Sequence, residues 1–281
     1  MRLRSLLFVP GDRPDRMEKA LDYRADALIL DLEDSVTSDA KTAARLATAS
    51  FLRKAKGRIR LFVRINPLDS DLLEDDLAAI LPVQPDGLVL PKAEGAASVE
   101  ALSRKAPDIP ILPIATETPA AIFQLGSYAS VKARLLGLTW GAEDLPAFMG
   151  ARGARDETGR FTPPYELARS LTLFGAHAIG VAAIETVYPD ISDPEGLRAY
   201  ARRASFDGFN GMMAIHPLQI PVINKAFTPT TDELAEAQAI VDAFAANPGK
   251  GAIRYAGRMI DAPHLRQARR TLELADDAPE L

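Results

Sequence analysis

Residues 111–119 read ILPIATETP, an apolar run that ends on the carboxylate of Glu117 just before a proline. Short, continuous apolar runs are typical of strands that are buried on both faces, as in a parallel sheet. A proline is tolerated in the first turn of a helix, so the stretch predicts a strand over Ile111–Glu117 and a helix from Pro119. A second apolar run, Leu135–Trp140, precedes the turn GAED and delivers another carboxylate, Asp144.

The same alternation of an apolar run and a helical segment occurs eight times along the chain. The other six strands are expected at Ser5–Pro10, Ala27–Leu32, Arg60–Asn66, Gly87–Lys92, Ile179–Ile184 and Phe209–Ile215. Eight such units predict an α/β fold of the (β/α)₈ TIM-barrel type. The competing interpretation is a doubly wound open sheet, which is disfavoured because no glycine-rich dinucleotide turn follows the first strand.

The domain organisation is predicted as one barrel with an extension. The barrel is expected over residues 1–228 and a C-terminal helical extension over residues 229–281, beginning with the amphipathic helix Thr231–Ala246. Within the barrel, residues 141–164 form a long connection rich in glycine and proline. Loops of this length inside a compact domain are uncommon and are often functional.

Composition excludes several classes of protein. The net charge of −5 argues against a nucleic-acid partner, which would call for a basic face. With no cysteine, thiol nucleophiles and thiolate zinc sites are excluded. The N-terminal apolar run is too short for a signal peptide and no stretch is long enough to span a membrane. We therefore expect a cytoplasmic protein that binds neither nucleic acid nor membrane.

The chemistry-bearing residues gather where strands end. They are Asp31, Glu33, Asp34, Arg64, Lys92, Glu117, Asp144 and His216. In a parallel barrel the carboxyl ends of the strands form the functional face, so these side chains are expected at one mouth of the barrel.

Glu117 and Asp144 are candidate ligands of a magnesium ion. Mg²⁺ prefers oxygen ligands and is usually held by one or two carboxylates together with substrate and water. The alternative is structural, with Asp144 capping a helix and Glu117 pairing with Arg64, and on the residue pattern alone the two interpretations stand even.

Arg64 interrupts an otherwise apolar strand, so its charge must meet a partner or a ligand if it is buried. Its planar guanidinium suits a carboxylate of a substrate, whereas the structural alternative is a pair with one of the acids after the second strand. Trp140 and His216 are expected to be structural. The arginines of the long loop, Arg152, Arg155 and Arg160, are expected to be solvated rather than to meet phosphates.

Eight ordered blocks of sequence resemble one known family over nearly the whole chain. They are RSLLFVPGDRPDRMEKA, LILDLEDSV followed by Lys41 and Ala44-Arg45, VRIN, LPKAE, ATETP, WGAEDL, IHPLQIPVINKAF and GRMIDAPHLRQAR. The chain resembles the citrate lyase beta-subunit-like family, within the HpcH/HpaI aldolase superfamily that includes malyl-CoA and citramalyl-CoA lyases. No P-loop, GxGxxG, HExxH or GxSxG motif competes with this resemblance.

The resemblance implies a Mg²⁺-dependent lyase that breaks or forms a carbon–carbon bond between a 2-oxo acid and a short acyl-CoA. By its motifs, Glu117 and Asp144 match the metal ligands, and Glu117 also lies at the substrate. Arg64 matches the residue that binds the carboxylate of the oxo acid, and the resemblance implies a catalytic role for it as well as a substrate-binding one. The cofactor-binding positions Arg13 and Lys19 match contacts to coenzyme A.

The resemblance also implies a role for the C-terminal extension. Asp261 resembles a catalytic aspartate on a lid that a neighbouring subunit lends to the site, which implies a homo-oligomer, a trimer or a hexamer. Glu185 departs from the family pattern, in which aspartate is expected after the seventh strand. Three alternatives stay open: a citrate lyase beta subunit that acts on a carrier-bound citryl group, a malyl-CoA thioesterase, and a non-catalytic binding protein.

Overall fold

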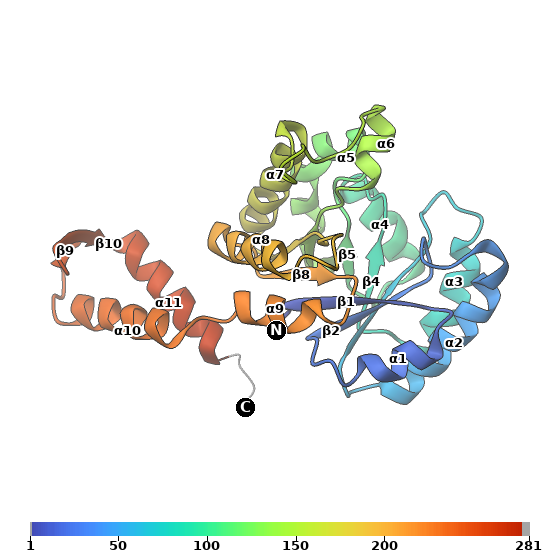
Figure 1. The fold of residues 1–281 in the computed structure, drawn as a ribbon, viewed down its shortest axis with the longest axis horizontal. Coiled ribbons are helices and arrows are strands. Elements are labelled where there is room, and N and C mark those ends of the chain that lie inside the picture. Colours follow the sequence, from blue (N-terminus) through green and yellow to red (C-terminus); the bar gives the residue numbers. More distant parts are fainter. Residues whose placement is uncertain (1, 277–281) are drawn as a thin grey trace. The chain divides into compact units, whose positions relative to one another are not determined.

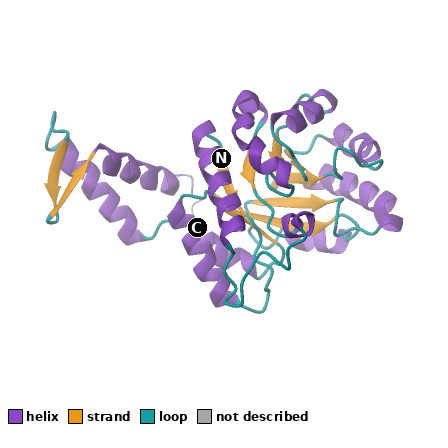
Figure 2. Ribbon diagram, turned by 90° about the horizontal axis from the view of Figure 1, so that it is seen from above, coloured by secondary structure: helices purple, strands orange, loops and turns teal. Residues whose placement is uncertain are grey.

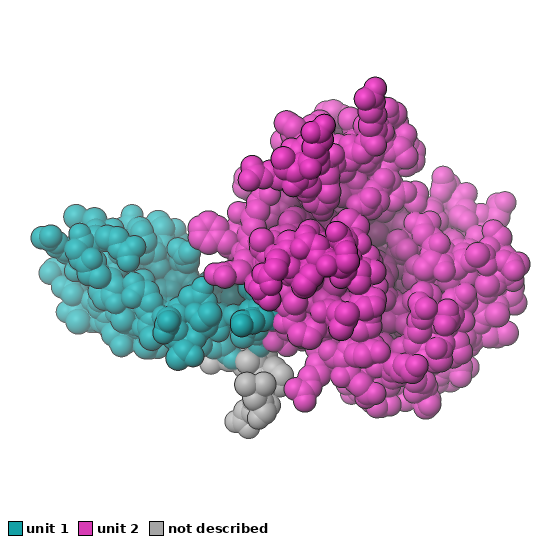
Figure 3. All heavy atoms as spheres, in the orientation of Figure 1, with its two compact units in different colours: residues 1–2, 225–281 teal, residues 3–224 magenta. Residues whose placement is uncertain are grey.

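The computed structural model describes residues 2–276 and divides the chain into two compact units. One unit comprises residues 3–224, and the other comprises residues 1–2 together with residues 225–281 (Figure 3). The division therefore falls a few residues before the boundary expected between residues 228 and 229. That the second unit acts as a lid stays a prediction.

The larger unit is a barrel of eight parallel strands (Figure 1). These are β1 (Ser5–Pro10), β2 (Ala27–Asp31), β3 (Arg60–Arg64), β4 (Gly87–Leu90), β5 (Ile111–Pro113), β6 (Gly137–Thr139), β7 (Ala182–Glu185) and β8 (Gly211–Ala214). Their order in the sheet is β5-β4-β3-β2-β1-β8-β7-β6. The two outer strands meet through the parallel bridges Ile111–Leu135 and Ile114–Thr139, so the barrel is nearly closed. The predicted TIM-barrel fold is confirmed.

Helices surround the strands on the outside of the barrel (Figures 1 and 2). They are α1 (Pro14–Ala20), α2 (Lys41–Ala55), α3 (Leu73–Ile80), α4 (Ala96–Lys105), α5 (Pro119–Gln124), α6 (Asp144–Met149), α7 (Pro163–Ile179), α8 (Pro194–Asp207) and α9 (Gln219–Ala226). Short 3₁₀ segments cover Ser38–Ala40, Leu81–Val83 and Leu125–Arg134. The long connection is thus not a plain loop, because α6 forms at its start.

The interior of the barrel is filled by apolar side chains from its strands. The core cluster comprises Leu3, Leu6, Ala27, Ile29, Phe62, Val89, Leu112, Ile114, Ile184 and Met213. Burying large aliphatic and aromatic side chains of this kind contributes roughly 1.5–3 kcal/mol each, which offsets the entropy lost on folding. Apolar packing inside the barrel is therefore a main source of its stability.

The second unit is a helical pair with a hairpin. It contains α10 (Thr231–Ala245), the antiparallel strands β9 (Ala252–Tyr255) and β10 (Arg258–Asp261), and α11 (Ala262–Asp276). Thr230 and Glu233 form a reciprocal capping box that starts α10. The hairpin was not expected from the sequence, because its strands are short, largely exposed and carry no apolar run. None of the helices within residues 2–276 is long and apolar enough to cross a bilayer.

Candidate active site

Arg64 lies at the end of β3, directly opposite Asp31 at the end of β2. Its Nε and Nη2 donate to the two carboxylate oxygens of Asp31, both at 2.7 Å, and its Nη1 lies 2.9 Å from Oε2 of Glu33. The guanidinium also lies 4.8 Å from the ring centre of Phe8. The structural pairing left open by the sequence is therefore present, and the pairing with Glu117 is not the one observed.

These contacts set the charge states at this edge of the site. Burial would raise the pKa of Asp31, but the hydrogen bonds and charge of Arg64 outweigh it and lower that pKa. Burial likewise opposes the charge of Arg64, whose pKa is nevertheless raised by Asp31 and Glu33. Arg64 is thus a permanent cation held by a permanent anion.

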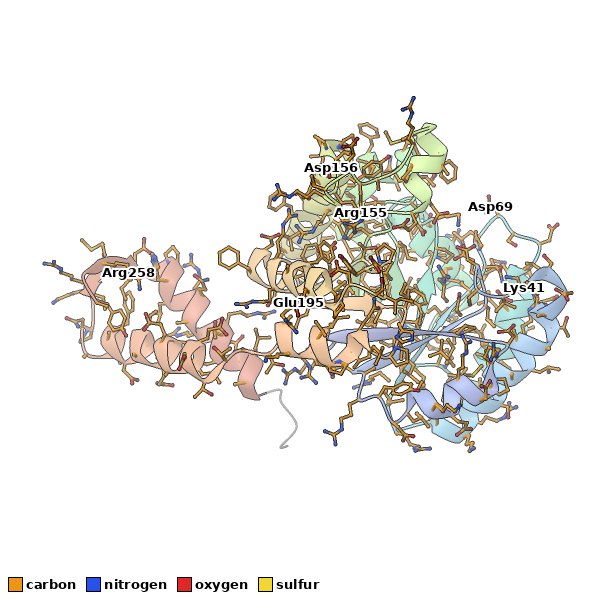
Figure 4. The ribbon with its side chains drawn as sticks, in the orientation of Figure 1. Lys41, Asp69, Arg155, Asp156, Glu195 and Arg258 are labelled. Carbon is orange, nitrogen blue, oxygen red and sulfur yellow. The ribbon has the colours of Figure 1, made fainter. Side chains whose placement is uncertain are left out.

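Lys41, labelled on α2 in Figure 4, anchors the loop that carries Glu33. Its Nζ donates to the backbone oxygens of Leu32 and Glu33 at 2.6 and 2.7 Å, and to Oδ1 of Asn66 at 3.0 Å. A buried lysine is costly unless its donors are satisfied, and here all three are. Lys41 therefore fixes the loop after β2, a role that the sequence pattern did not indicate.

Glu117 and Asp144 converge through Lys92, which follows β4. Oε2 of Glu117 accepts the backbone N–H of Lys92 at 2.6 Å, and Oδ1 of Asp144 lies 3.3 Å from Nζ of Lys92. Glu117 is almost fully buried, whereas the side chain of Asp144 is about one-third exposed. Asp144 is the first residue of α6 and Glu143 occupies the cap position, so the capping role that the sequence left open for Asp144 is not observed.

The residues present fit a divalent cation. Five carboxylates lie in this cluster (Asp31, Glu33, Asp34, Glu117 and Asp144), and the cations beside them are Arg64, Lys92 and Lys41. When all are ionised, an excess of two negative charges is left beside an oxygen-only donor set of the kind Mg²⁺ prefers. Within residues 2–276 no cluster of three or more His, Cys, Asp or Glu side chains is arranged to hold a metal alone. Substrate and water oxygens would therefore complete the shell.

Gly141, in the loop after β6, leaves the space that the carboxylate of Glu117 occupies. A Cβ at this position would lie 2.6 Å from Cγ and 3.1 Å from Oε1 of Glu117, closer than side-chain atoms pack. The glycine is therefore required by the close approach of the carboxylate rather than by a left-handed backbone.

Replacing Gly141 with alanine is expected to displace Glu117 and to weaken Mg²⁺ binding about tenfold or more, as loss of ligand orientation does. Isothermal titration calorimetry measures the affinity, and circular dichroism checks the fold. Gly126→Ala is the matched control, because a Cβ at Gly126 meets no atom within 4 Å. Unchanged Mg²⁺ affinity in Gly141→Ala would mean that Glu117 does not bind the ion.

The carboxyl group of Glu117 has a strongly raised pKa. Burial raises its pKa from the ordinary 4.5 to about 8, with Asp144 and Glu33 adding to the rise and the Lys92 amide opposing it. Between these two values the folded protein binds more protons than the unfolded chain, so this group makes the free energy of unfolding fall as pH rises. Above about pH 8 the full penalty of burying the charge persists.

A pH series tests this assignment on metal-free protein. The melting temperature of the wild type is expected to fall more steeply from about pH 5 to about pH 8.5 than that of Glu117→Gln, which has no proton to lose. Saturating Mg²⁺ should flatten the wild-type profile, since the ion compensates the ionised carboxylate. Parallel profiles for the two proteins would contradict the raised pKa.

A cavity of about 360 Å³ lies between β1, α1 and the loop after β8. Its lining includes the cations Arg16 and Lys19, the acid Asp15, and His216. Of the two residues predicted to contact coenzyme A, both within the described part of the chain, only Lys19 lines this cavity. Arg13 lies at the start of α1, with its Nε 3.5 Å from Asp15. Arg16, which the sequence did not single out, also lines the cavity, and its three-residue spacing from Lys19 places both on one helix face.

Glu185, the departure from the family pattern, is completely buried at the end of β7. It accepts hydrogen bonds from Trp140 Nε1 and Tyr200 OH through Oε1, and from Arg169 Nε through Oε2. Trp140 is fully buried, as the structural interpretation predicted. This network holds the residue that leads from β6 into the loop of Gly141 and Asp144.

Arg155 of the long connection corrects the expectation of a solvated loop. Figure 4 labels it in the loop after α6. Its guanidinium lies 3.7 Å from the ring centre of Phe161, and its Nη1 donates to the backbone oxygen of Gly159. Stacking on an aromatic face therefore holds Arg155 to the protein, whereas Arg152 and Arg160 are exposed as predicted.

Asp261 belongs to the second compact unit, at the end of β10. Its Oδ1 lies 2.6 Å from Nδ1 of His264, and both side chains are about half exposed. His264 was not singled out in the sequence, where only its three-residue spacing from Asp261 could have indicated the contact.

Comparison with known proteins identifies the family. Residues 4–217 match the sequence profile of the HpcH/HpaI aldolase/citrate lyase family. A citrate lyase subunit beta-like protein of Mycobacterium tuberculosis is 37% identical over 97% of this chain and 95% of its own length. A (3S)-malyl-CoA thioesterase of Cereibacter sphaeroides is 34% identical over 97% of this chain and 94% of its own length.

Among solved structures, CitE of Mycobacterium tuberculosis in complex with magnesium, acetoacetate and coenzyme A has a TM-score of 0.86 and 35% identity. It covers 98% of each chain. The agreement extends over the barrel and the C-terminal unit alike, and it confirms the prediction of an enzyme of the carbon–carbon lyase type. The chain belongs to the HpcH/HpaI aldolase/citrate lyase family.

Proposed function

We propose that the protein is a Mg²⁺-dependent lyase that cleaves or forms a 3-hydroxyacyl-CoA thioester, such as citramalyl-CoA or malyl-CoA. The products of cleavage are a 2-oxo acid and an acyl-CoA. The observation that carries the proposal is the convergence of Glu117 and Asp144 on Lys92, with an excess of negative charge. The ligands of related structures support it, because CitE has been solved with magnesium and coenzyme A, and also with magnesium and pyruvate.

Arg64 is proposed to bind the carboxylate of the oxo acid. Its Nε and Nη2 are committed to Asp31, which fixes the plane of the guanidinium. A guanidinium has five N–H donors, so Nη1 and Nη2 keep hydrogens that the two bonds to Asp31 do not use. A fixed cation of this kind stabilises a substrate anion with little reorganisation.

Coenzyme A is proposed to enter through the cavity beside α1. Arg16 and Lys19 supply positive charge for phosphate groups, and the apolar atoms of Leu7, Phe8 and Val9 line the same cavity. A mixed lining of this type suits a ligand with an anionic end and a neutral chain. Arg13, at the start of the same helix, would meet the ligand outside this cavity.

Each of these residues has a separate role in the proposed reaction. When bound, Mg²⁺ supplies Lewis-acid charge that lowers the pKa of the substrate hydroxyl and stabilises the oxygen that becomes the carbonyl. Glu117 and Asp144 hold the ion, and Arg64 orients the oxo-acid portion. In the cleavage direction the substrate hydroxyl loses its proton to solvent and becomes the carbonyl, the carbon–carbon bond breaks, and the resulting enolate of the acyl-CoA takes up one proton at carbon. Asp261 is the proposed acid in this direction and the base in the other.

Asp261→Asn is expected to lower kcat by about a hundredfold or more, the usual contribution of a general acid–base group, while oxo-acid binding is retained. Chromatography of quenched reactions measures turnover, and calorimetry with pyruvate measures oxo-acid binding. Mixing Asp261→Asn subunits with Glu117→Ala subunits should restore part of the activity if a neighbouring subunit lends the aspartate. Wild-type turnover in Asp261→Asn would contradict the lid role.

The homo-oligomer, a trimer or a hexamer, is a proposal that follows from this lent aspartate. Light scattering coupled to gel filtration measures the mass of the particle directly. A monomer at assay concentration that is fully active would contradict both the oligomer and the lent residue.

A panel of 3-hydroxyacyl-CoA thioesters tests the function as a whole. A lyase gives an oxo acid and an acyl-CoA in the presence of Mg²⁺. A thioesterase, the named activity of the Cereibacter relatives, gives free coenzyme A and an intact hydroxy acid. Turnover of a citryl group only on a carrier protein would favour the citrate lyase beta subunit instead. No Mg²⁺-dependent product from any thioester would overturn the proposal.

A further inference from the structure

Lys92 has an unusual backbone for a lysine. Its φ of +50° lies in the left-handed region, which residues with a side chain seldom adopt. Such conformations persist where the surroundings determine them, and they cluster at functional sites. At Lys92 the backbone N–H is one of these determinants, because it donates to Oε2 of Glu117 at 2.6 Å.

The side chain of Lys92 reaches two further carboxylates. Its Nζ lies 3.0 Å from Oε1 of Glu33 and 3.3 Å from Oδ1 of Asp144. The single residue Lys92, in the loop after β4, thus contacts acids that follow β2, β5 and β6 in the chain. Glu33 is buried, and Arg64, its other cationic partner, is already bound to Asp31.

From this geometry we infer that Lys92 is the resident cation of the metal site. Its ammonium group forms an ion pair with the carboxylate of Asp144 in the metal-free protein and competes with Mg²⁺ for that carboxylate. The inference rests on the proposed metal-binding role of Glu117 and Asp144 and goes beyond it, because it assigns what sets the affinity of the site. Lys92 acts on the ion through the carboxylates and through like-charge repulsion, and it is not itself a ligand.

Two opposite effects distinguish this role from simple support of the site. Without the ammonium, the charges of Glu33 and Asp144 are less compensated, so the metal-free protein should melt at a lower temperature. The same loss removes a competitor and a repelling charge, so Mg²⁺ should bind more tightly. A residue that merely held the ligands in place would, when removed, lower both stability and affinity.

The test uses Lys92→Met, which keeps the length of the side chain but not its charge. Mg²⁺ affinity by calorimetry is expected to rise about tenfold at a fixed pH, while the melting temperature of the metal-free protein falls. Lys92→Arg keeps the charge and should stay within about threefold of the wild type. Lys105→Met removes an exposed lysine from α4 and controls for net charge.

A glycine variant keeps the inference testable if the methionine variant folds poorly. Lys92→Gly also removes the ammonium but relieves the left-handed backbone, so it should bind Mg²⁺ more tightly without that strain. Affinity that is unchanged or weaker in both neutral variants overturns the inference. If the wild type itself binds no Mg²⁺, or if Glu117→Ala binds it equally well, the proposed metal site is wrong. The inference about Lys92 is then wrong as well.

Discussion

Replacing Glu117 with alanine is expected to abolish Mg²⁺-dependent turnover, by about a thousandfold or more in kcat/KM, because a bound metal contributes several kcal/mol to the transition state. The fold should survive, since the carboxylate is buried at a cost: burial raises its pKa to about 8. Metal-free Glu117→Ala is therefore expected to melt no lower than the wild type near pH 8. Activity is followed by product chromatography and stability by calorimetry.

The matched control for this variant is Glu100→Ala, which removes an exposed carboxylate from α4. It should leave both turnover and Mg²⁺ affinity unchanged. Full activity in Glu117→Ala would refute the metal assignment outright. Lost activity with unchanged Mg²⁺ affinity would instead place Glu117 at the substrate alone.

Replacing Arg64 with methionine is expected to cost about 3–5 kcal/mol of stability, because it leaves the buried carboxylates of Asp31 and Glu33 without their main partner. The reason is visible in the geometry: two bonds of 2.7 Å join Arg64 to Asp31. Oxo-acid binding should be lost as well. Urea denaturation measures the free energy of unfolding, and calorimetry with pyruvate measures the affinity.

Two further variants separate these effects. The first is Arg60→Met. Arg60 lies on the same strand as Arg64, but its Nη1 is 3.9 Å from Asp86 and about half of its side chain is exposed. The substitution should change stability by about 1 kcal/mol or less. Arg64→Lys keeps the charge without the planar fork, so it should fold better than Arg64→Met and still bind the oxo acid weakly. If Arg64→Lys binds the oxo acid as the wild type does, the proposed role of the guanidinium in binding the oxo acid is wrong.

The fold was predictable because its signals are local. Each buried strand reads as a continuous apolar run, and each run is followed by a helical segment, so the number and order of units follow from the chain itself. Most strand ends were predicted too late, as where Ile111–Glu117 shortens to Ile111–Pro113, whereas β1 ends as predicted and β7 ends one residue later than predicted. The hydrogen-bonding partner decides where a strand ends, and β5 pairs across the closure of the barrel only at isolated positions.

The location of the candidate site was also predictable, whereas its contacts were not. Glu117, Asp144 and Arg64 were placed at one mouth because parallel strands end on the same side. That Arg64 meets Asp31 depends on the register of β2 against β3, and that Lys92 meets both Glu117 and Asp144 depends on three separate loops. Glu185 was missed as the partner of Trp140 for the same reason, because 45 residues separate them.

By itself the sequence determined the count and order of the βα units, the position of two carboxylates after neighbouring strands, and the resemblance to a family of lyases. These are properties of short stretches, in which apolar runs and strand-end residues carry their meaning locally. Only the tertiary structure decided which cation faces which carboxylate and how far burial raises the pKa of Glu117. Those quantities depend on desolvation and on charges brought from distant parts of the chain, and a charge acts through space, not along the sequence.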